Sequence, residues 1–306
     1  MRNMKHKLEQ PASLMLTRRR VLQGTLGAWL LPIAGGAMLA GCGGGSDSDS
    51  DHQLAATPVL ASVPNFRDLA DAEGASVYRT AKGKALQRGV FYRSNALVPS
   101  AADLATLNTL DIGAVYDLRT MSEVASQPDI LPQGAAYTNI NIMGSSSAAS
   151  PGISTAEDAI GYMENLNRMM VTDAGYRERL AELFTAMADG PHAQLYHCTA
   201  GKDRTGWVSA VLMSLVDVPQ SDIMQNYLLT NKYTAAQIET QHQGMIAAYG
   251  QAYADAYYPL LGVQSSFLHA GLDQASESYG SMSGYITNGL GLSASVQSAL
   301  TDRLLG

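Results

Sequence analysis

The chain has 306 residues, of which 46% are hydrophobic and 15% are charged, a composition typical of a folded globular protein rather than a disordered one. Residues 1–41 hold six of the 20 basic and one of the 27 acidic residues, so the remaining 14 basic and 26 acidic residues carry a net charge of −12. Such an acidic body repels the backbone of nucleic acids, which excludes general nucleic-acid binding, and any phosphate site must be built locally from a few groups.

The first 41 residues have the layout of an export signal. A basic start ends in Arg18-Arg19-Arg20, an uncharged and mostly apolar run follows over residues 21–39, and small residues lead to Cys42. The arginines before Val21-Leu22 resemble a twin-arginine signal, and Leu39-Ala40-Gly41-Cys42 resembles the lipobox of bacterial lipoproteins. We expect an exported protein that is anchored to a membrane through a lipid on Cys42, on the periplasmic or cell-surface side. A membrane-spanning helix is the alternative, although glycines and a proline interrupt the apolar run.

Residues 42–57 are rich in Gly, Ser and Asp, which predicts a flexible linker before a folded domain at 58–306. In the first part of that domain, short apolar runs alternate with segments of helical periodicity. We expect strands at 77–79, 90–93, 112–118, 136–142 and 193–197, helices at 101–110, 156–170 and 175–187, and a loop at 144–154.

Helices dominate the part of the chain after residue 198. Val208, Val211, Leu212 and Leu215 recur at the spacing of one helical face, and the helix should end near Val218-Pro219. Strands concentrated before residue 198 and helices after it predict an α/β fold, with a central, mostly parallel sheet flanked by helices and a helical C-terminal half. Further helices are expected at 221–229, 234–249, 265–278 and 293–305.

One motif joins a predicted strand to a predicted helix, and in it a cysteine is followed six positions later by an arginine. A loop of this length can turn its backbone N–H groups inward to hold an anion, and the following helix adds its positive N-terminal end. Gly201 permits a backbone conformation that a side chain would oppose, and Arg204 can bind two phosphate oxygens at once. The motif reads His197-Cys198-Thr199-Ala200-Gly201-Lys202-Asp203-Arg204-Thr205-Gly206, and its residues 199–202 are the candidate substrate-binding residues.

The same positive field favours a thiolate at Cys198, which makes this residue the candidate nucleophile. Attack on phosphorus would give a phosphocysteine that water hydrolyses, while the loop and Arg204 hold the outer phosphate oxygens. Thr205 is placed to donate a hydrogen bond to the sulfur, and His197 is placed to orient the loop.

Other interpretations of the motif remain open. A structural cysteine in a strand–helix turn would not need the glycine, arginine and threonine, and a phosphate-binding lipoprotein without catalysis would not need the thiol. A sulfurtransferase also uses a loop cysteine, although Arg204-Thr205 favours phosphate. The loop is not a Walker A motif, because Asp203 follows Gly201-Lys202. The six histidines are scattered, and we predict neither a metal nor a cofactor.

This loop resembles the signature of the protein-tyrosine phosphatase superfamily, and its Lys-Asp pair resembles the atypical bacterial branch of secreted tyrosine and dual- or triple-specificity phosphatases. Asn65-Phe66-Arg67-Asp68-Leu69, Val90-Phe91-Tyr92-Arg93-Ser94 and Asp117-Leu118-Arg119 with Glu123 resemble other elements of that branch. The resemblance covers about residues 60–305. It implies a central sheet with the loop at its C-terminal edge, and it implies hydrolysis of phosphotyrosine, with phosphoserine and phosphothreonine as further substrates.

By this resemblance, Cys198 is the nucleophile and Arg204 the phosphate clamp. Lys202 and Asp203 mark broader specificity, and Lys202 could reach a second phosphate on an inositol ring, so phosphoinositides are the alternative substrates. No Trp-Pro-Asp loop, which carries the general acid of common tyrosine phosphatases, occurs in the sequence. We therefore expect Asp203 to be the general acid, with Asp117 as second choice or as a buried partner of a nearby arginine. Residues 143–172 could contribute to a lid, but their methionines would equally suit the core.

Overall fold

The computed structural model describes residues 56–73, 76–144, 152–191 and 193–306. The predicted signal, Cys42 and nearly all of the predicted linker lie outside these residues. Thr57, the last linker residue, is bonded to the domain: its N–H donates to Asp71 at 3.0 Å, and its hydroxyl oxygen accepts from the N–H of Asp68 at 3.0 Å. Thr57 is therefore held against the folded domain that follows it. Among the described residues, no helix combines the length and hydropathy needed to cross a bilayer.

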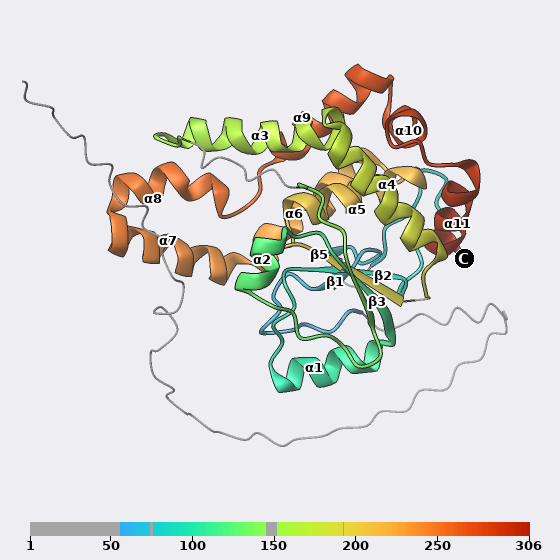
Figure 1. Cartoon of the computed structure of the whole chain (residues 1–306), viewed down its shortest axis with the longest axis horizontal. Helices are drawn as coiled ribbons and strands as arrows, with labels where there is room; N and C mark the ends of the chain where they lie inside the picture. The colour runs from blue at the N-terminus through green and yellow to red at the C-terminus, as the bar shows by residue number, and fades with distance from the viewer. Residues whose placement is uncertain (1–55, 74–75, 145–151, 192) are drawn as a thin grey trace, which may run out of the picture. The chain divides into compact units, whose positions relative to one another are not determined.

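A five-stranded sheet lies at the centre of the domain (Figure 1). Its strand order is β1-β2-β5-β3-β4, and all neighbours pair in parallel except β1, which runs antiparallel to β2 at one edge. The mostly parallel sheet that we predicted is therefore present. The expected strand at 77–79 forms only isolated bridges, from Val77 to Asp71 and from Arg79 to Ala85. The strands are β1 (Arg67–Asp68), β2 (Phe91–Ser94), β3 (Ile112–Asp117), β4 (Ala136–Asn139) and β5 (Ala193–His197).

The two faces of the sheet are buried unequally, because successive side chains of a strand point to opposite sides. Leu195 and Val115 point to the face that packs against α1 (Ala101–Leu107) and the segment near residue 60. Tyr196 and Tyr116 point to the other face and join the larger core beneath most of the helices. All five residues of β5 are buried, as expected for the middle strand of a covered parallel sheet.

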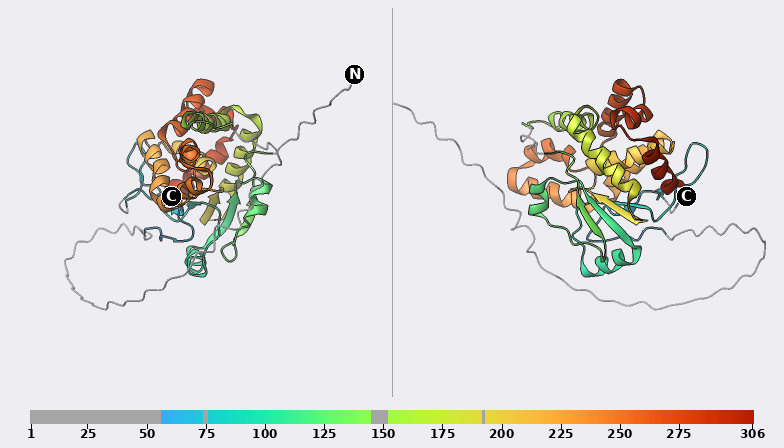
Figure 2. Two further views of the ribbon diagram at one scale, coloured as in Figure 1. Left: turned by 90° about the vertical axis from the view of Figure 1, so that its left-hand side faces the viewer. Right: turned by 45° about the vertical axis from the view of Figure 1, so that its right-hand side comes forward.

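The large helical layer covers one side of the sheet and α1 the other (Figure 2). Its central member is α5, in which every residue from Arg204 to Met213 is buried, so the helix that follows the cysteine loop is fixed from all sides. The sequence did not predict α2, α8 or the short α10. The remaining helices are α2 (Met121–Ser126), α3 (Ala156–Thr172), α4 (Ala174–Asp189), α5 (Asp203–Leu215), α6 (Gln220–Tyr233), α7 (Ala235–Tyr249), α8 (Gln251–Tyr257), α9 (Ser265–Tyr279), α10 (Met282–Gly284) and α11 (Ala294–Leu305), with tighter or wider turns at Asn108–Leu110, Tyr258–Leu260 and Tyr285–Gly289.

The helix in the segment considered as a lid belongs to the core instead. Helix α3 packs along α9, and Met163 and Met170 are buried in the main hydrophobic cluster. Residues 145–151 of this segment lie outside the described part of the chain. The methionines of α3 therefore fill the core, which was the alternative interpretation.

Candidate active site

The loop between β5 and α5 is held open by bonds to its outward-facing carbonyl groups. The side-chain amide of Asn65 donates to the carbonyl oxygens of Ala200 and Gly201 at 3.0 and 2.9 Å, and Arg93 donates to that of Gly201 at 2.9 Å. In a planar trans peptide the next N–H points away from the carbonyl, so the N–H groups of residues 201 and 202 face the inside of the loop. This is the arrangement of an anion-binding nest.

Gly201 is required at its position for two physical reasons. Its φ is +67°, in the left-handed region that residues with a side chain rarely adopt. A Cβ added at this position would lie 2.3 Å from the carbonyl oxygen of Ser94, at the end of β2. Any larger residue would therefore push the loop away from the sheet.

Arg204, in the first turn of α5, is clamped by Glu123 from α2. Its two terminal nitrogens donate to the two Glu123 oxygens at 2.8 and 2.7 Å, and one of them also donates to the Leu118 carbonyl at 3.1 Å. Among described residues, these bonds use three of the five guanidinium N–H donors, so Nε and one terminal N–H remain for phosphate oxygens. The guanidinium is thus fixed in orientation before any substrate arrives.

The pKa values of both side chains are shifted in the direction that keeps Glu123 ionised and Arg204 protonated. Burial alone would raise the pKa of Glu123, but Arg204, the Thr199 hydroxyl and the Thr120 N–H lower it to about 2. Burial opposes the charge of Arg204, yet Cys198 and Glu123 raise the pKa of the guanidinium above its ordinary value. Thr199, a predicted substrate-binding residue, therefore bonds through its side chain to the carboxylate that orients Arg204.

Replacing Glu123 by Gln is expected to lower kcat about tenfold, because one neutral amide cannot hold both guanidinium nitrogens. The variant should also change acid stability. A pKa of about 2, below the ordinary 4.5, means that the ionised carboxylate stabilises the fold above about pH 4.5 and that this contribution disappears as the pH falls through about 2. Denaturant unfolding at several pH values should show a stability gap between wild type and variant that is full at neutral pH and closes toward pH 2.

Glu164→Gln is the matched control, because Glu164 pairs with Arg168 on the outer side of α3. It makes the same charge change in a partly exposed pair, and we expect it to leave kcat unchanged. A stability gap for Glu123→Gln that stays constant from neutral pH to pH 2 would contradict the role given to its ionised carboxylate.

Cys198 lies at the base of the loop with 3% of its surface exposed. The residue before it, His197, is fully buried, and its ring lies between two oxygen atoms: Nδ1 is 3.3 Å from the Cys198 carbonyl and Nε2 is 3.2 Å from an Asp129 oxygen. His197 thus lies between the backbone of Cys198, the predicted nucleophile, and a buried carboxylate, a position consistent with orienting the loop.

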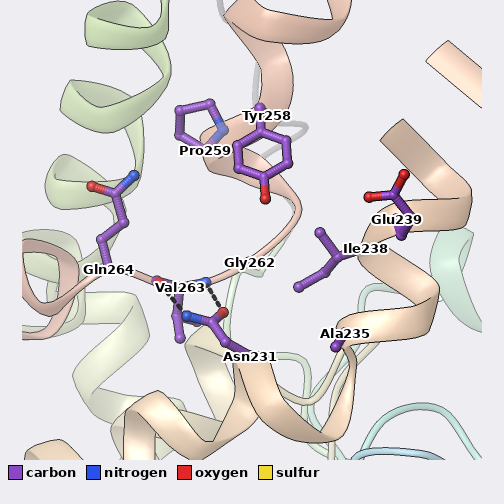
Figure 3. Close-up of a pocket in the computed structure, with 9 residues that line it drawn as sticks. All are labelled: Asn231, Ala235, Ile238, Glu239, Tyr258, Pro259, Gly262, Val263 and Gln264. Carbon is purple, nitrogen blue, oxygen red and sulfur yellow. Dashed lines mark hydrogen bonds between the residues drawn. The ribbon is translucent and has the colours of Figure 1, made fainter. Parts of the chain in front are cut away.

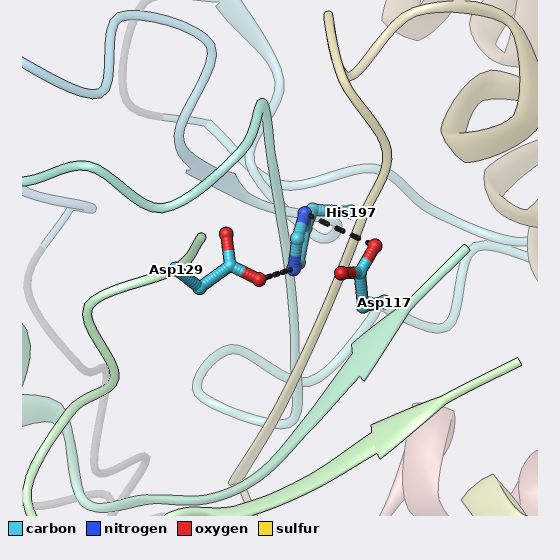
Figure 4. Close-up of side chains that lie close together, drawn as sticks. All are labelled: Asp117, Asp129 and His197. Atoms are coloured by element: carbon cyan, nitrogen blue, oxygen red, sulfur yellow. Dashed lines mark ion pairs between the residues drawn. The ribbon is translucent and has the colours of Figure 1, made fainter. Parts of the chain in front are cut away.

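Asp117, Asp129 and His197 form a cluster behind the loop, with ligand-type atoms within 4.8 Å of one another (Figure 4). Such spacing would suit a metal ion, but Arg119 already supplies a positive charge there. Its guanidinium donates to both Asp117 oxygens and, at 2.7 Å, to Asp129. Because a bound arginine satisfies both carboxylates, we assign no metal to this cluster and interpret it as an ion-pair support for the loop.

Asp117, the second choice for the general acid, belongs to this support. Its carboxylate is fully buried and accepts from Arg119 and from the Tyr137 hydroxyl at 2.8 Å. Burial alone would raise the pKa of Asp117, but Arg119 and His197 lower it below the ordinary value. A carboxylate held ionised in this way is poorly suited to donate a proton, so the structure favours the ion-pairing alternative for Asp117.

Asp203 and Thr205 lie in the first turn of α5, and each has a side-chain oxygen that makes no hydrogen bond among the described residues. In the described part of the chain, one Asp203 oxygen and the Thr205 hydroxyl are buried without a hydrogen-bond partner. The expected bond from Thr205 to the Cys198 sulfur is therefore not formed in this structure. The other Asp203 oxygen lies 3.7 Å from the ammonium of Lys202.

The Lys202 ammonium is bonded to backbone carbonyl groups rather than left free for a second phosphate. Its ammonium donates to the carbonyl oxygens of Leu260 and, at 3.1 Å, Gly262, in the connection between α8 and α9. The residue is 8% exposed, so the charge is enclosed rather than presented to solvent. Lys202 thus ties the loop between β5 and α5 to a segment about 60 positions later in the chain.

Four residues that shape the site were not assigned these roles from the sequence. Asn65 and Arg93 hold the loop carbonyls, Glu123 holds Arg204, and Asp129 holds His197. Thr120-x-x-Glu123 is a capping-box pattern that could have predicted α2, and the structure contains both of its bonds. Asn65, Arg93 and Glu123 stand in motifs already singled out, whereas no local signal marks Asp129.

Comparison with known proteins gives consistent results. The model of a tyrosine phosphatase family matches residues 58–306. The chain is 32% identical, over 74% of its length and 82% of the relative's, to a Cupriavidus necator protein named as a tyrosine-protein phosphatase. It is 29% identical to the triple specificity protein phosphatase PtpB of Mycobacterium tuberculosis, over 79% of this chain and 95% of that protein.

Solved structures also show similarity, among them the following one. The crystal structure of TpbA from P. aeruginosa aligns over 74% of this chain and 99% of that chain, at 18% identity and a TM-score of 0.26. That score is too low to support a conclusion about the fold, which follows instead from the observed strand order and the helices around it.

Proposed function

The chain belongs to the tyrosine phosphatase family, and from this premise we propose that it hydrolyses phosphotyrosine in proteins through a phosphocysteine on Cys198, with phosphoserine and phosphothreonine as further substrates. The observation that carries the proposal is the clamp of Glu123 on Arg204, at the end of a loop whose Ala200 and Gly201 carbonyl groups bond outward. Such a site is built to hold a tetrahedral dianion next to a thiol.

In the proposed reaction, the Cys198 sulfur attacks phosphorus, a P–S bond forms and the bond from phosphorus to the substrate oxygen breaks. The leaving oxygen takes a proton from a general acid. Water then attacks phosphorus and gives a proton to the conjugate base of that acid, the P–S bond breaks with its electron pair returning to sulfur, and inorganic phosphate leaves. Throughout both steps Arg204 and the loop N–H groups neutralise the outer oxygens, and this fixed electrostatic support carries most of the rate enhancement.

The covalent intermediate provides the direct test. The purified protein should hydrolyse p-nitrophenyl phosphate with chelator present, and acid quenching during turnover should trap a mass gain of one phosphoryl group on the peptide that contains Cys198. Turnover without any trapped adduct, under conditions where hydrolysis of the adduct is slow, would argue for direct attack by water.

We propose Asp203 as the general acid, supported by its place in the first turn of α5 and by its unpaired buried oxygen. Asp203→Asn should lower kcat roughly 10²-fold for phosphoserine peptides, whose leaving oxygen needs a proton, and much less for p-nitrophenyl phosphate. Because the p-nitrophenolate leaving group needs no proton, the difference between the two losses of kcat measures proton donation separately from other effects of the substitution. Equal losses on both would contradict the assignment.

Phosphoinositides remain the alternative substrates, but the geometry of Lys202 favours phosphoproteins. Its ammonium is bonded to the carbonyls of Leu260 and Gly262, so binding a second phosphate would require breaking both bonds. A phosphate-binding role without catalysis is disfavoured because it leaves the buried Cys198 unexplained.

We further propose that the protein is exported and tethered to a membrane by a lipid on Cys42, which the sequence pattern of residues 1–42 supports. Cys42→Ser should move the protein out of the membrane fraction. Retention of this variant in the membrane fraction would instead favour a spanning helix.

A further inference from the structure

A cavity of about 270 Å³ lies beside the catalytic loop, between the first turns of α7 and the connection that joins α8 to α9 (Figure 3). A smaller cavity of about 70 Å³ lies between it and the loop and is lined by Ala200 and Lys202. Ile238 lines both cavities, and Gly262, which lines the larger one, accepts a hydrogen bond from Lys202. The larger cavity therefore adjoins the phosphate loop in two ways. It shares Ile238 with the smaller cavity, which Ala200 and Lys202 line, and its Gly262 is hydrogen-bonded to Lys202.

The wall of the larger cavity combines apolar and polar side chains, and one side of it is held in place by hydrogen bonds. Ile238, Pro259 and Val263 contribute apolar surface, and the ring of Tyr258 stands at its edge. Asn231 holds the far wall, because its side-chain amide bonds both the N–H and the carbonyl of Val263 at 2.8 Å. The cavity thus keeps its shape without a ligand, which favours binding.

Glu239 is the single charged residue among those that line the cavity. One of its oxygens accepts from Gln243 at 2.9 Å, while among described residues the other has no hydrogen-bond donor. Figure 3 shows the carboxylate on the α7 side, facing the same space as the Tyr258 hydroxyl. A partly apolar wall that carries one carboxylate suits a long side chain that has an apolar stem and a cationic end.

We propose that this cavity, beside the phosphate loop, receives a lysine or arginine side chain that flanks the phosphorylated residue of a protein substrate. The inference rests on the proposed phosphoprotein phosphatase function. The stem packs against Ile238 and Val263, and the cation pairs with Glu239 beside the Tyr258 ring. The same carboxylate repels an acidic flanking residue. The cavity therefore favours substrates with a basic flanking residue and disfavours substrates with an acidic one.

The test uses phosphotyrosine peptides that differ at one flanking position, with Lys, Ala or Glu placed in turn at each neighbouring site. For wild type, we expect kcat/KM to be roughly threefold to fivefold higher for Lys than for Ala at one of these sites. Glu239→Gln should remove that preference, and Glu239→Lys should make the Glu peptide the better substrate. Turnover of p-nitrophenyl phosphate, which has no flanking residue, should not change.

Glu182→Gln, the same charge change in an exposed pair with Arg179 on α4, should keep the lysine preference. Absence of any lysine preference in wild type, or a preference that survives in both Glu239 variants, would overturn the proposal. Failure of the proposed function is a separate outcome, since wild type would then not hydrolyse p-nitrophenyl phosphate at all.

Discussion

Replacement of Cys198 by serine should abolish turnover of p-nitrophenyl phosphate, with kcat at least about 10⁴-fold below wild type. A serine hydroxyl stays protonated at neutral pH even beside Arg204, so it is a far weaker nucleophile than a thiolate. The loss should come from chemistry rather than unfolding, because the two side chains have the same shape and the loop is held by Asn65 and Arg93. The thermal midpoint should therefore change little.

Cys42→Ser is the matched control, since Cys42 and Cys198 are the two cysteines of the sequence. It replaces the other cysteine, which lies outside the proposed site, and should leave kcat unchanged. The Cys198→Ser variant should still bind inorganic phosphate, because the loop N–H groups and Arg204 remain. Substantial turnover by Cys198→Ser would mean that another group, or water alone, attacks phosphorus.

The central part of the site could be predicted because its residues are contiguous. A strand, a loop with one glycine and a helix together determine where Cys198, Gly201 and Arg204 lie, and each step depends on local backbone geometry. The parallel sheet was predictable for a similar reason, since β3 and β5 are apolar runs separated by helices.

The supports of the site could not be predicted in the same way, because they come from distant parts of the chain. Asn65 is 136 positions from Gly201, and Glu123 is 81 positions from Arg204. These hydrogen bonds form only once α2 and β2 have packed next to the loop. The spacing of apolar residues in the sequence does not predict such contacts between distant segments. Lys202 is an example of a role that the sequence alone did not predict. Its charge suggested that it binds a phosphate, whereas in the structure its ammonium donates to two backbone carbonyls.

Arg204→Lys is expected to lower kcat/KM roughly 10³-fold, although it keeps the positive charge. The guanidinium bonds Glu123 with two nitrogens and still offers donors to the substrate, whereas an ammonium is a point charge that cannot do both. Inorganic phosphate should also inhibit the variant less strongly, because the same donors hold product. The comparison therefore measures the geometry of the clamp separately from its charge.

Arg168→Lys on α3 is the control for this prediction, because Arg168 is 42% exposed and pairs only with Glu164 among described residues. It should leave kcat/KM unchanged, as expected for an exposed pair whose charge is retained. In Arg204→Lys, Glu123 loses one of its two charged bonds inside the protein, so a modest loss of stability of about 1–2 kcal/mol should accompany the loss of activity. Activity near wild type would show that charge alone at this position suffices, and that the rigid Glu123–Arg204 pair does not position the phosphate.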